Sequence, residues 1–82
     1  MKILKFSAEW CQPCKMLQKV IDDVKDKLTV EIEPVDIEEN SELSKQYQIR
    51  GVPTLVMIDD DGIEVKRNVG MINKDKLLEW VK

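Results

Sequence analysis

The spacing of apolar residues changes several times along the chain, and each change marks a new predicted element. Residues 2–6 form a short, mostly apolar run, which predicts a strand. From Cys14 onward the apolar residues recur every three or four positions, with charged and amide residues between them, which predicts an amphipathic helix. Pro13 suits the first turn of that helix, because an N–H in the first turn has no partner within the helix. The apolar face of the predicted helix consists of Leu17, Val20, Ile21, Val24 and Leu28.

The middle of the chain predicts a strand at the edge of a sheet, followed by a short helix. Residues 29–37 alternate between apolar and polar, and the alternation changes phase after Pro34. Proline has no N–H to donate to a neighbouring strand, so this strand belongs at an edge. Either Asn40 or Ser41 can cap a short helix after it. That helix carries Leu43 and Tyr47 on its apolar side.

The last third of the chain predicts a hairpin and a closing helix. Residues 54–58 are an unbroken apolar run, as expected of a strand that is covered on both faces. Three aspartates and Gly62 follow, and they predict a hairpin turn in which the glycine takes a positive φ. Ile63 and Val65 then alternate with charged residues in a return strand. Asn73 can cap a last helix, whose inner face consists of Leu77, Leu78 and Val81.

These elements follow the order β-α-β-α-β-β-α, which restricts the architecture. The first β-α-β unit is expected to be a right-handed crossover between parallel strands, and the last two strands are expected to pair as a hairpin. An α/β fold with one mixed four-stranded sheet and helices on both of its faces accommodates every element. With 82 residues, we expect a single domain over residues 1–82.

The composition limits what such a domain can bind. Charged residues make up 35% of the chain with a net charge of −3, and no basic patch suggests nucleic acid. No apolar run approaches the roughly 18 residues that cross a bilayer. The first six residues are too few and too charged for the core of a signal peptide. We therefore expect a monomer in the cytoplasm, with no nucleic-acid or membrane partner.

The candidate chemistry lies in Cys11 and Cys14, the only cysteines of the chain. A disulfide stabilises mainly by restricting the unfolded chain, and that effect is small for two cysteines so close together. Redox chemistry explains the pair better, since a thiolate attacks a disulfide and a second thiol then releases the product. The start of a helix favours a thiolate, because free backbone N–H groups and the positive end of the helix dipole meet there. We expect Cys11 to be the more exposed sulfur and the nucleophile, and Cys14, one turn inward, to resolve the mixed disulfide.

Four motifs together resemble the thioredoxin family over nearly the whole chain, namely AEWCQPCKM, VDIEEN, IRGVPTL and NVG. A Cys-x-x-Cys motif alone is also typical of zinc sites, but joined to Gly-Val-Pro-Thr about 40 residues later it is highly specific. The resemblance implies a minimal thioredoxin fold and a thiol–disulfide oxidoreductase that reduces disulfides in partner proteins. It implies no cofactor and no metal, and a separate electron donor of the thioredoxin-reductase type.

The resemblance also implies a substrate-binding surface around the cysteine pair. In this family the proline that matches Pro53 follows a cis peptide bond, which turns the backbone of Val52 outward so that an extended substrate segment can pair with it. A plain proline at the start of a strand is the alternative. Trp10 is either an apolar wall of this surface or an aromatic residue packed at the end of the sheet, whereas for Trp80 we expect packing. The implied surface consists of Trp10, Gln12, Pro13, Val52, Pro53, Gly70 and Met71.

The chain departs from the family pattern in three places. Gln12 and Pro13 separate the cysteines where typical thioredoxins have Gly-Pro. The family's buried acidic residue aligns with Lys5, and the lysine that it often faces aligns with Pro34. Lys5 either extends its ammonium out of the end of the strand or holds it near Cys14, where it would stabilise the thiolate and raise the reduction potential. The carboxylates that could take over the proton transfer are Glu9, Asp36 and Glu38.

Three other functions are compatible with parts of the pattern. A glutaredoxin-like role with glutathione is the nearest, but Gln-Pro between the cysteines and the lack of an obvious basic cluster for a tripeptide's carboxylates argue against it. A structural zinc site needs four ligands, and with two cysteines and no histidine it would require a dimer. A non-redox adaptor would leave the position of the cysteines unexplained.

Overall fold

A four-stranded sheet forms the centre of the protein, whose computed structural model describes residues 1–82. The strands lie in the order β2-β1-β3-β4. Along the chain the elements are β1 (Lys2–Ser7), α1 (Gln12–Val24), β2 (Glu31–Asp36), α2 (Ser41–Gln46), β3 (Thr54–Ile58), β4 (Glu64–Val69) and α3 (Lys74–Trp80), and a 3₁₀ turn (Lys25–Lys27) follows α1. The predicted order β-α-β-α-β-β-α is confirmed.

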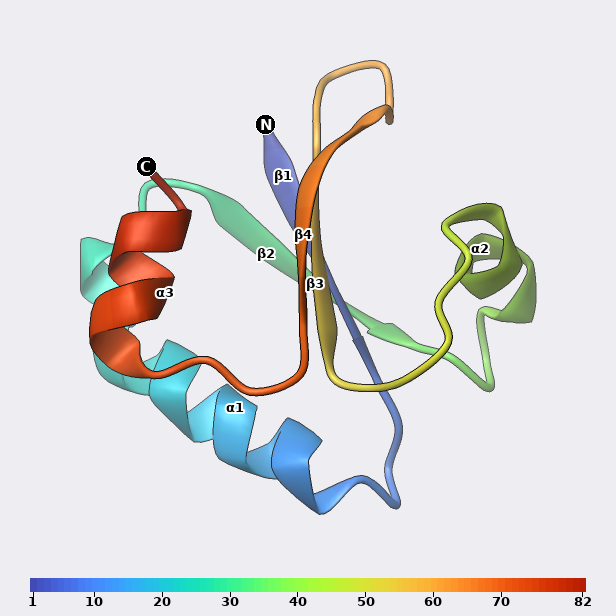
Figure 1. Cartoon of the computed structure of the whole chain (residues 1–82), viewed down its shortest axis with the longest axis horizontal. Coiled ribbons are helices and arrows are strands. Elements are labelled where there is room, and N and C mark those ends of the chain that lie inside the picture. Colours follow the sequence, from blue (N-terminus) through green and yellow to red (C-terminus); the bar gives the residue numbers. More distant parts are fainter.

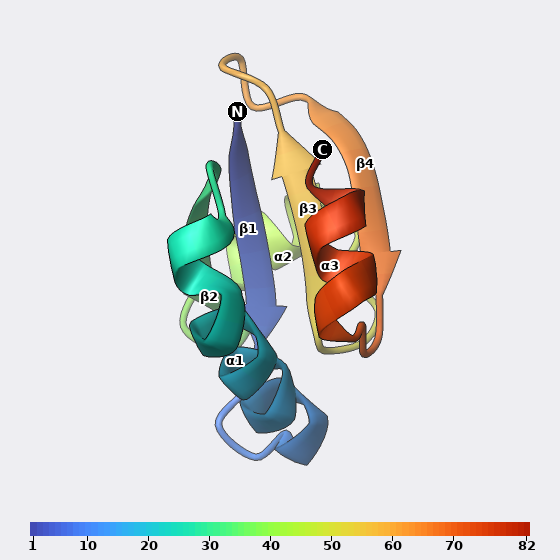
Figure 2. The same cartoon turned by 90° about the vertical axis from the view of Figure 1, so that its left-hand side faces the viewer.

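The helices cover both faces of the sheet. β1 pairs in parallel with β2 and antiparallel with β3, and β3 pairs antiparallel with β4 as a hairpin. α1 and α3 lie together on one face, and α2 lies on the other (Figure 1, Figure 2). This is the mixed α/β sheet that the order of elements predicts.

Two apolar cores lie on opposite faces of the sheet, and β1 contributes to both because successive side chains of a strand point to opposite faces. Ile3 packs under α1 and α3, whereas Leu4 and Phe6 pack on the side of α2. The core under α1 and α3 consists of Ile3, Leu17, Ile21, Val24, Leu55, Met57, Ile72 and Leu77. The core on the side of α2 consists of Leu4, Phe6, Val35, Tyr47 and Val56.

The edge position predicted for the strand that contains Pro34 is confirmed, because β2 lies at one end of the sheet. Ile32 packs against the core under α1, whereas Val35 belongs to the core on the side of α2. The change of phase after Pro34 is therefore not an irregularity of the strand. One regular alternation directs the even-numbered residues of β2 toward α1 and the odd-numbered residues toward α2.

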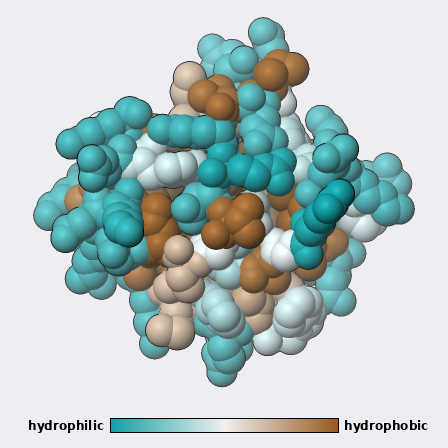
Figure 3. All heavy atoms as spheres, viewed as in Figure 1, coloured by the Kyte–Doolittle hydropathy of each residue, from teal (hydrophilic) through white to brown (hydrophobic).

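The face of the molecule in Figure 3 is largely hydrophilic, with apolar side chains gathered in small patches between hydrophilic ones. β4, the second edge strand, also carries exposed apolar side chains, with Val65 at 47% and Val69 at 68% exposure. The predicted return strand is present, but Ile63 and Val65 are exposed. The alternation of Ile63 and Val65 with charged residues therefore predicted the strand correctly, but these two side chains do not form a buried face. No helix in the structure combines the length and the apolar character that crossing a membrane requires.

Local signals account for the turn and for the start of the last helix. Gly62 has a φ of 80° between β3 and β4, as predicted. The side chain of Asn73 caps α3 by accepting a hydrogen bond of 2.9 Å from the N–H of Lys76. Asn40 precedes α2, but its side chain does not cap that helix and donates instead to the carbonyl of Asp36 at 3.2 Å.

Candidate functional site

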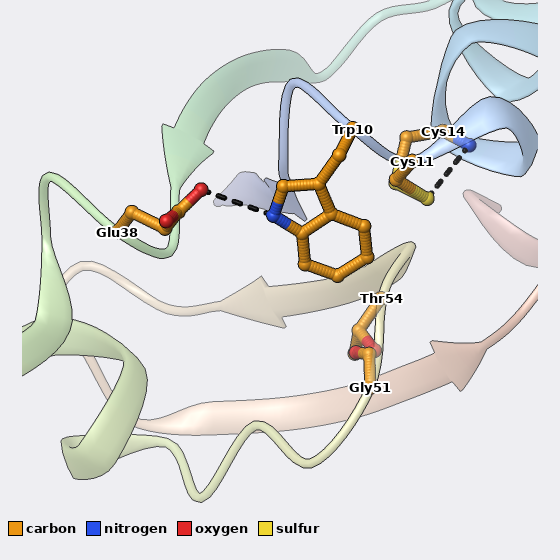
Figure 4. The surroundings of a disulfide bond; sticks show 6 residues. All are labelled: Trp10, Cys11, Cys14, Glu38, Gly51 and Thr54. Atoms are coloured by element: carbon orange, nitrogen blue, oxygen red, sulfur yellow. Dashed lines mark hydrogen bonds between the residues drawn. A yellow bond between two sulfur atoms is a disulfide. The ribbon is translucent and has the colours of Figure 1, made fainter.

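Cys11 and Cys14 form a disulfide at the start of α1, with their Cα atoms 5.3 Å apart. β1 ends at Ser7, and a short loop leads to Cys11, which is the N-cap residue of α1. Pro13 lies in the first turn, as predicted. The backbone N–H of Cys14 donates a hydrogen bond of 3.2 Å to Sγ of Cys11 (Figure 4). The sulfur of Cys11 therefore receives a donor from the helix N-terminus, which favours its thiolate once the disulfide is reduced.

The two cysteines do not differ in exposure. Each is 5% exposed, and both belong to a small apolar cluster with Ala8, against which Ile37 and Val52 pack. The expectation that Cys11 is the more exposed of the two is therefore wrong, because residues from other segments cover both. The physical difference between them is the hydrogen bond from the N–H of Cys14, which only the sulfur of Cys11 receives.

A cis peptide bond joins Val52 to Pro53 directly before β3, as the family resemblance implies. The hydroxyl of Thr54 donates to the carbonyl of Gly51 at 2.7 Å, and the N–H of Gly70 donates to the carbonyl of Pro53 at 2.8 Å. Val52 takes part in none of the backbone hydrogen bonds outside the regular elements. The side chain of Val52 packs against the cluster of Ala8, Cys11 and Cys14.

Trp10 forms an exposed wall beside the cysteine pair. It is 67% exposed, and its indole N–H donates a hydrogen bond of 3.0 Å to Glu38 (Figure 4). Trp10, Ile37 and Val52 line a hollow of about 300 Å³. The alternative in which Trp10 packs at the end of the sheet is therefore wrong. Trp80, in contrast, packs against the core under α1, as expected.

The other residues predicted for the substrate surface lie between the two cysteines and directly after β4. Gln12 and Pro13 are exposed in the first turn of α1. Gly70, with a φ of 92°, follows β4 and reaches Pro53 through its N–H. Met71 is 44% exposed beside it. The loop before β3 and the end of β4 are thus brought together next to the start of α1.

Lys5 is the only buried charged side chain of the protein, at 7% exposure. Its ammonium does not extend out of the strand end, because Nζ donates a hydrogen bond to Gln18 on α1. The amide of Gln18 donates in turn to Asp22 at 2.9 Å. Burial lowers the pKa of Lys5, and the negative charge of Asp22 opposes that shift. Lys5 and Cys14 are both among the residues that line one hollow, of about 240 Å³, and Lys5 also lines a second hollow, under α1, that Cys14 does not line.

Gln18 is the residue of this site that the sequence pattern did not identify. The helical periodicity assigns it to the polar side of α1, yet it is half-buried and bonds the ammonium of Lys5. One signal could have found it, namely that Gln18 follows Cys14 by four residues. Residues four apart lie on the same face of a helix.

The three candidate carboxylates differ in position. Glu9 and Asp36 line the hollow that Cys14 and Lys5 share. Glu38 instead binds the indole of Trp10 and does not line that hollow. No group of three or more His, Cys, Asp or Glu side chains is arranged so that it could hold a metal ion.

Sequence comparison relates the chain to one family along its whole length. A family model described as Thioredoxin matches residues 1–82. The thioredoxin of Rickettsia bellii is 37% identical over 81 residues, which cover 96% of this chain and 76% of that protein. The thioredoxin of Chlamydia trachomatis is 40% identical over 80 residues, which cover 96% of this chain and 78% of that protein. Such relatives imply a disulfide oxidoreductase activity, and the close pair of Cys11 and Cys14 is consistent with it.

Solved structures give the same result for the fold. A mutant thioredoxin from Halobacterium salinarum superimposes with a TM-score of 0.86 at 35% identity, and the match covers 96% of this chain and 69% of that chain. Thioredoxin-2 of the malaria parasite has a TM-score of 0.87 at 21% identity, and the match covers 96% of this chain and 78% of that chain. At that identity the second likeness concerns the fold alone. The predicted minimal thioredoxin fold is confirmed.

Proposed function

This chain belongs to the thioredoxin family, and on that basis we propose that it reduces disulfides in partner proteins, with Cys11 as the nucleophile and Cys14 as the resolving thiol. The observation that best supports these roles is the hydrogen bond from the N–H of Cys14 to the sulfur of Cys11. A hydrogen bond to the ionised form lowers the pKa of a thiol. A larger fraction of Cys11 is then the thiolate, which is the form that attacks a disulfide.

The proposed reaction has two steps. The thiolate of Cys11 attacks one sulfur of the substrate disulfide, forms a mixed disulfide with it and releases the other substrate sulfur as a thiolate. Cys14 then loses its proton and attacks Sγ of Cys11, which breaks the mixed disulfide and releases the second substrate thiolate. The protein is left with the disulfide between Cys11 and Cys14. A separate reductase of the thioredoxin-reductase type would supply the two electrons that restore the dithiol.

The substrate is proposed to bind as an extended segment along Val52. The unpaired N–H and C=O of Val52 would hydrogen-bond that segment as the backbone of a neighbouring strand does. Trp10 offers exposed apolar surface on one side, and the flexible side chain of Met71 adapts to varied partners on the other. The whole proposed surface consists of Trp10, Gln12, Pro13, Val52, Pro53, Gly70 and Met71.

We also propose that Lys5 tunes the reduction potential of the cysteine pair. Lys5 and Cys14 line one hollow, and a positive charge at that hollow would stabilise a thiolate and therefore the reduced state. A single-domain monomer over residues 1–82, acting in the cytoplasm where thiols are kept reduced, fits this function.

Two single variants test the proposed roles of the cysteines. The wild type should accelerate the reduction of insulin disulfides by dithiothreitol, and both Cys11→Ser and Cys14→Ser should lose that activity. When each variant is incubated with oxidised insulin, Cys14→Ser should accumulate a covalent mixed disulfide, because attachment is intact and only release is blocked. Cys11→Ser should not accumulate it.

The double variant Cys11→Ser/Cys14→Ser is the control for non-covalent association, and mass spectrometry without reductant identifies the adducts. Equal yields of adduct from both single variants would mean that the two sulfurs are interchangeable and that the assigned roles are wrong. A wild type that leaves the rate of insulin reduction unchanged would contradict the proposed function itself.

A further inference from the structure

The resolving step requires Cys14 to lose a proton. A free thiol has a pKa near 8.5, so only a few per cent of it is the reactive thiolate at neutral pH. The helix N–H that favours a thiolate is directed at Cys11 alone. A proton acceptor close to Cys14 would therefore accelerate the resolving step.

Cys14 lines a hollow of about 240 Å³ between α1 and the ends of β1 and β2. Each segment around this hollow contributes one charged side chain to its wall. These are Lys5 from β1, Glu9 from the loop after β1, Lys15 from α1 and Asp36 from β2. A water molecule takes up about 30 Å³ in the liquid, so the hollow has room for water between these groups and Cys14.

Among the four charged groups, only a carboxylate can take up the proton. An ammonium has three N–H donors and no lone pair, so Lys5 and Lys15 cannot accept it. Glu9 is exposed on a loop, where its longer side chain has more rotamer freedom to lose before it points at Cys14. Asp36 is left as the acceptor that the fold could hold in position.

Asp36 is held in position by the sheet and by the turn that follows it. It pairs with Ser7 in the ladder between β1 and β2, and its side chain faces α1 like the other even-numbered residues of β2. Oδ1 of Asp36 accepts hydrogen bonds from the N–H of Glu38 at 2.8 Å and from the N–H of Glu39 at 3.2 Å. These two bonds orient the carboxylate and leave Oδ2 for another partner.

We propose that Asp36 accepts the proton of Cys14, through water in this hollow, during the resolving step; this inference rests on the proposed function. The S–H bond of Cys14 breaks, the proton passes to Oδ2, and the electron pair left on the sulfur attacks Sγ of Cys11. The bond between Cys11 and Cys14 forms as the bond to the substrate sulfur breaks, and the substrate leaves as a thiolate. Asp36 then returns the proton to solvent. The ammonium of Lys5, on the same hollow, stabilises the thiolate as it forms.

Whether Asp36→Asn slows or speeds the attack of Cys14 shows whether Asp36 acts as a proton acceptor or only as a nearby negative charge. A negative charge raises the pKa of a neighbouring thiol, so its removal in Asp36→Asn would by itself increase the thiolate of Cys14 and speed the attack. Loss of a proton acceptor slows the attack, by a factor on the order of 100 or more. Asparagine keeps a side-chain oxygen for the N–H groups of Glu38 and Glu39, so the turn is preserved.

Mixing an excess of reduced protein with 5,5′-dithiobis(2-nitrobenzoate) separates the two steps. Attack by Cys11 releases one nitrothiobenzoate at a rate that depends on protein concentration, and attack by Cys14 releases the second at a rate that does not. In Asp36→Asn we expect an unchanged first phase, and a second phase slowed on the order of 100-fold at pH 6 to 7. The second phases of variant and wild type should converge above about pH 10, where the thiol ionises without help.

Glu9→Gln is the matched control, because it removes the other carboxylate on the hollow and should slow neither phase. Asp36→Glu keeps a carboxylate and should recover part of the lost rate. A second phase in Asp36→Asn as fast as in the wild type, or faster, would overturn the inference, and so would an equal slowing in Glu9→Gln. A wild type that releases neither nitrothiobenzoate would instead overturn the proposed function.

Discussion

Replacing Lys5 with methionine removes the one buried charge of the protein and keeps an unbranched side chain. In the role proposed for Lys5, its ammonium stabilises a thiolate of the reduced protein across the hollow that Lys5 and Cys14 both line. The oxidised protein contains no thiolate, so the same charge gives it no such stabilisation. Lys5→Met therefore destabilises the reduced state relative to the oxidised state, and we expect the reduction potential to fall.

The size of the decrease in reduction potential depends on how far the charge of Lys5 shifts the pKa of the thiol. An opposite charge close to an ionisable group shifts its pKa by about one to three units. We use a shift of about one unit for the thiol, because the ammonium of Lys5 also interacts with Gln18 and Asp22, which weakens its effect on the sulfur. One pKa unit corresponds to about 1.4 kcal/mol, which is about 30 mV for a two-electron couple. The potential of Lys5→Met is thus expected about 30 mV below that of the wild type where the thiols are ionised.

The shift should depend on pH in a way that identifies Lys5 as its cause. The difference in reduction potential between variant and wild type should increase as the pH rises from neutral, because thiolates form. It should disappear above the pKa of Lys5, where the ammonium loses its charge; burial holds that pKa below the ordinary value of 10.5. Between that lowered pKa and 10.5 the unfolded chain binds one more proton at Lys5 than the folded chain does. The free energy of unfolding of the wild type therefore rises with pH in this window, and Lys5→Met should lack that rise.

Equilibration with dithiothreitol redox buffers at a series of pH values, followed by alkylation of free thiols and mass spectrometry, gives the potentials. Lys25→Met is the matched control, because it also removes one lysine charge but at an exposed position. Lys25 lines a hollow under α1 together with Lys5, but it does not line the hollow that contains Cys14. A Lys5→Met potential within about 5 mV of the wild type at every pH would refute the reasoning, because it corresponds to well under 1 kcal/mol. An equal shift in Lys25→Met would show that net charge, and not position, is responsible.

Two further measurements address the nucleophile and the core. The rate of iodoacetamide alkylation of Cys11 in the Cys14→Ser variant, followed against pH, should have its midpoint below about 8.5, because the helix N-terminus favours the thiolate; a midpoint at or above that value would contradict the activated nucleophile. Val56→Ala, at a fully buried site of the central strand β3, should lower the free energy of unfolding by about 2 kcal/mol. Val69→Ala, at a site that is 68% exposed on β4, should change it by less than about 0.5 kcal/mol, and similar losses in both variants would contradict the assigned core.

Short stretches of sequence were enough to predict the elements, the fold and the position of the redox pair. Pro13 and the apolar spacing after it predicted the start of α1, and Gly62 and Asn73 predicted a turn and a helix cap. Each of these signals depends on the conformational preferences of a few neighbouring residues, so it can be read without knowing the rest of the fold. The motifs around Cys11 and Pro53 identified the family for the same reason, since each is a continuous run of residues.

Which side chains face the sulfurs was decided only by the tertiary structure. The ladder between β1 and β2 brings Asp36 beside Ser7, and the packing of α1 on the sheet brings Gln18 to Lys5. The hydrogen bonds of Lys5 with Gln18 and of Trp10 with Glu38 join residues 13 and 28 positions apart in the chain. The equal burial of both cysteines likewise comes partly from Ile37 and Val52, which belong to distant segments. Strand register and helix docking set these contacts, and because both result from packing over the whole domain, no local pattern around Cys11 contains them.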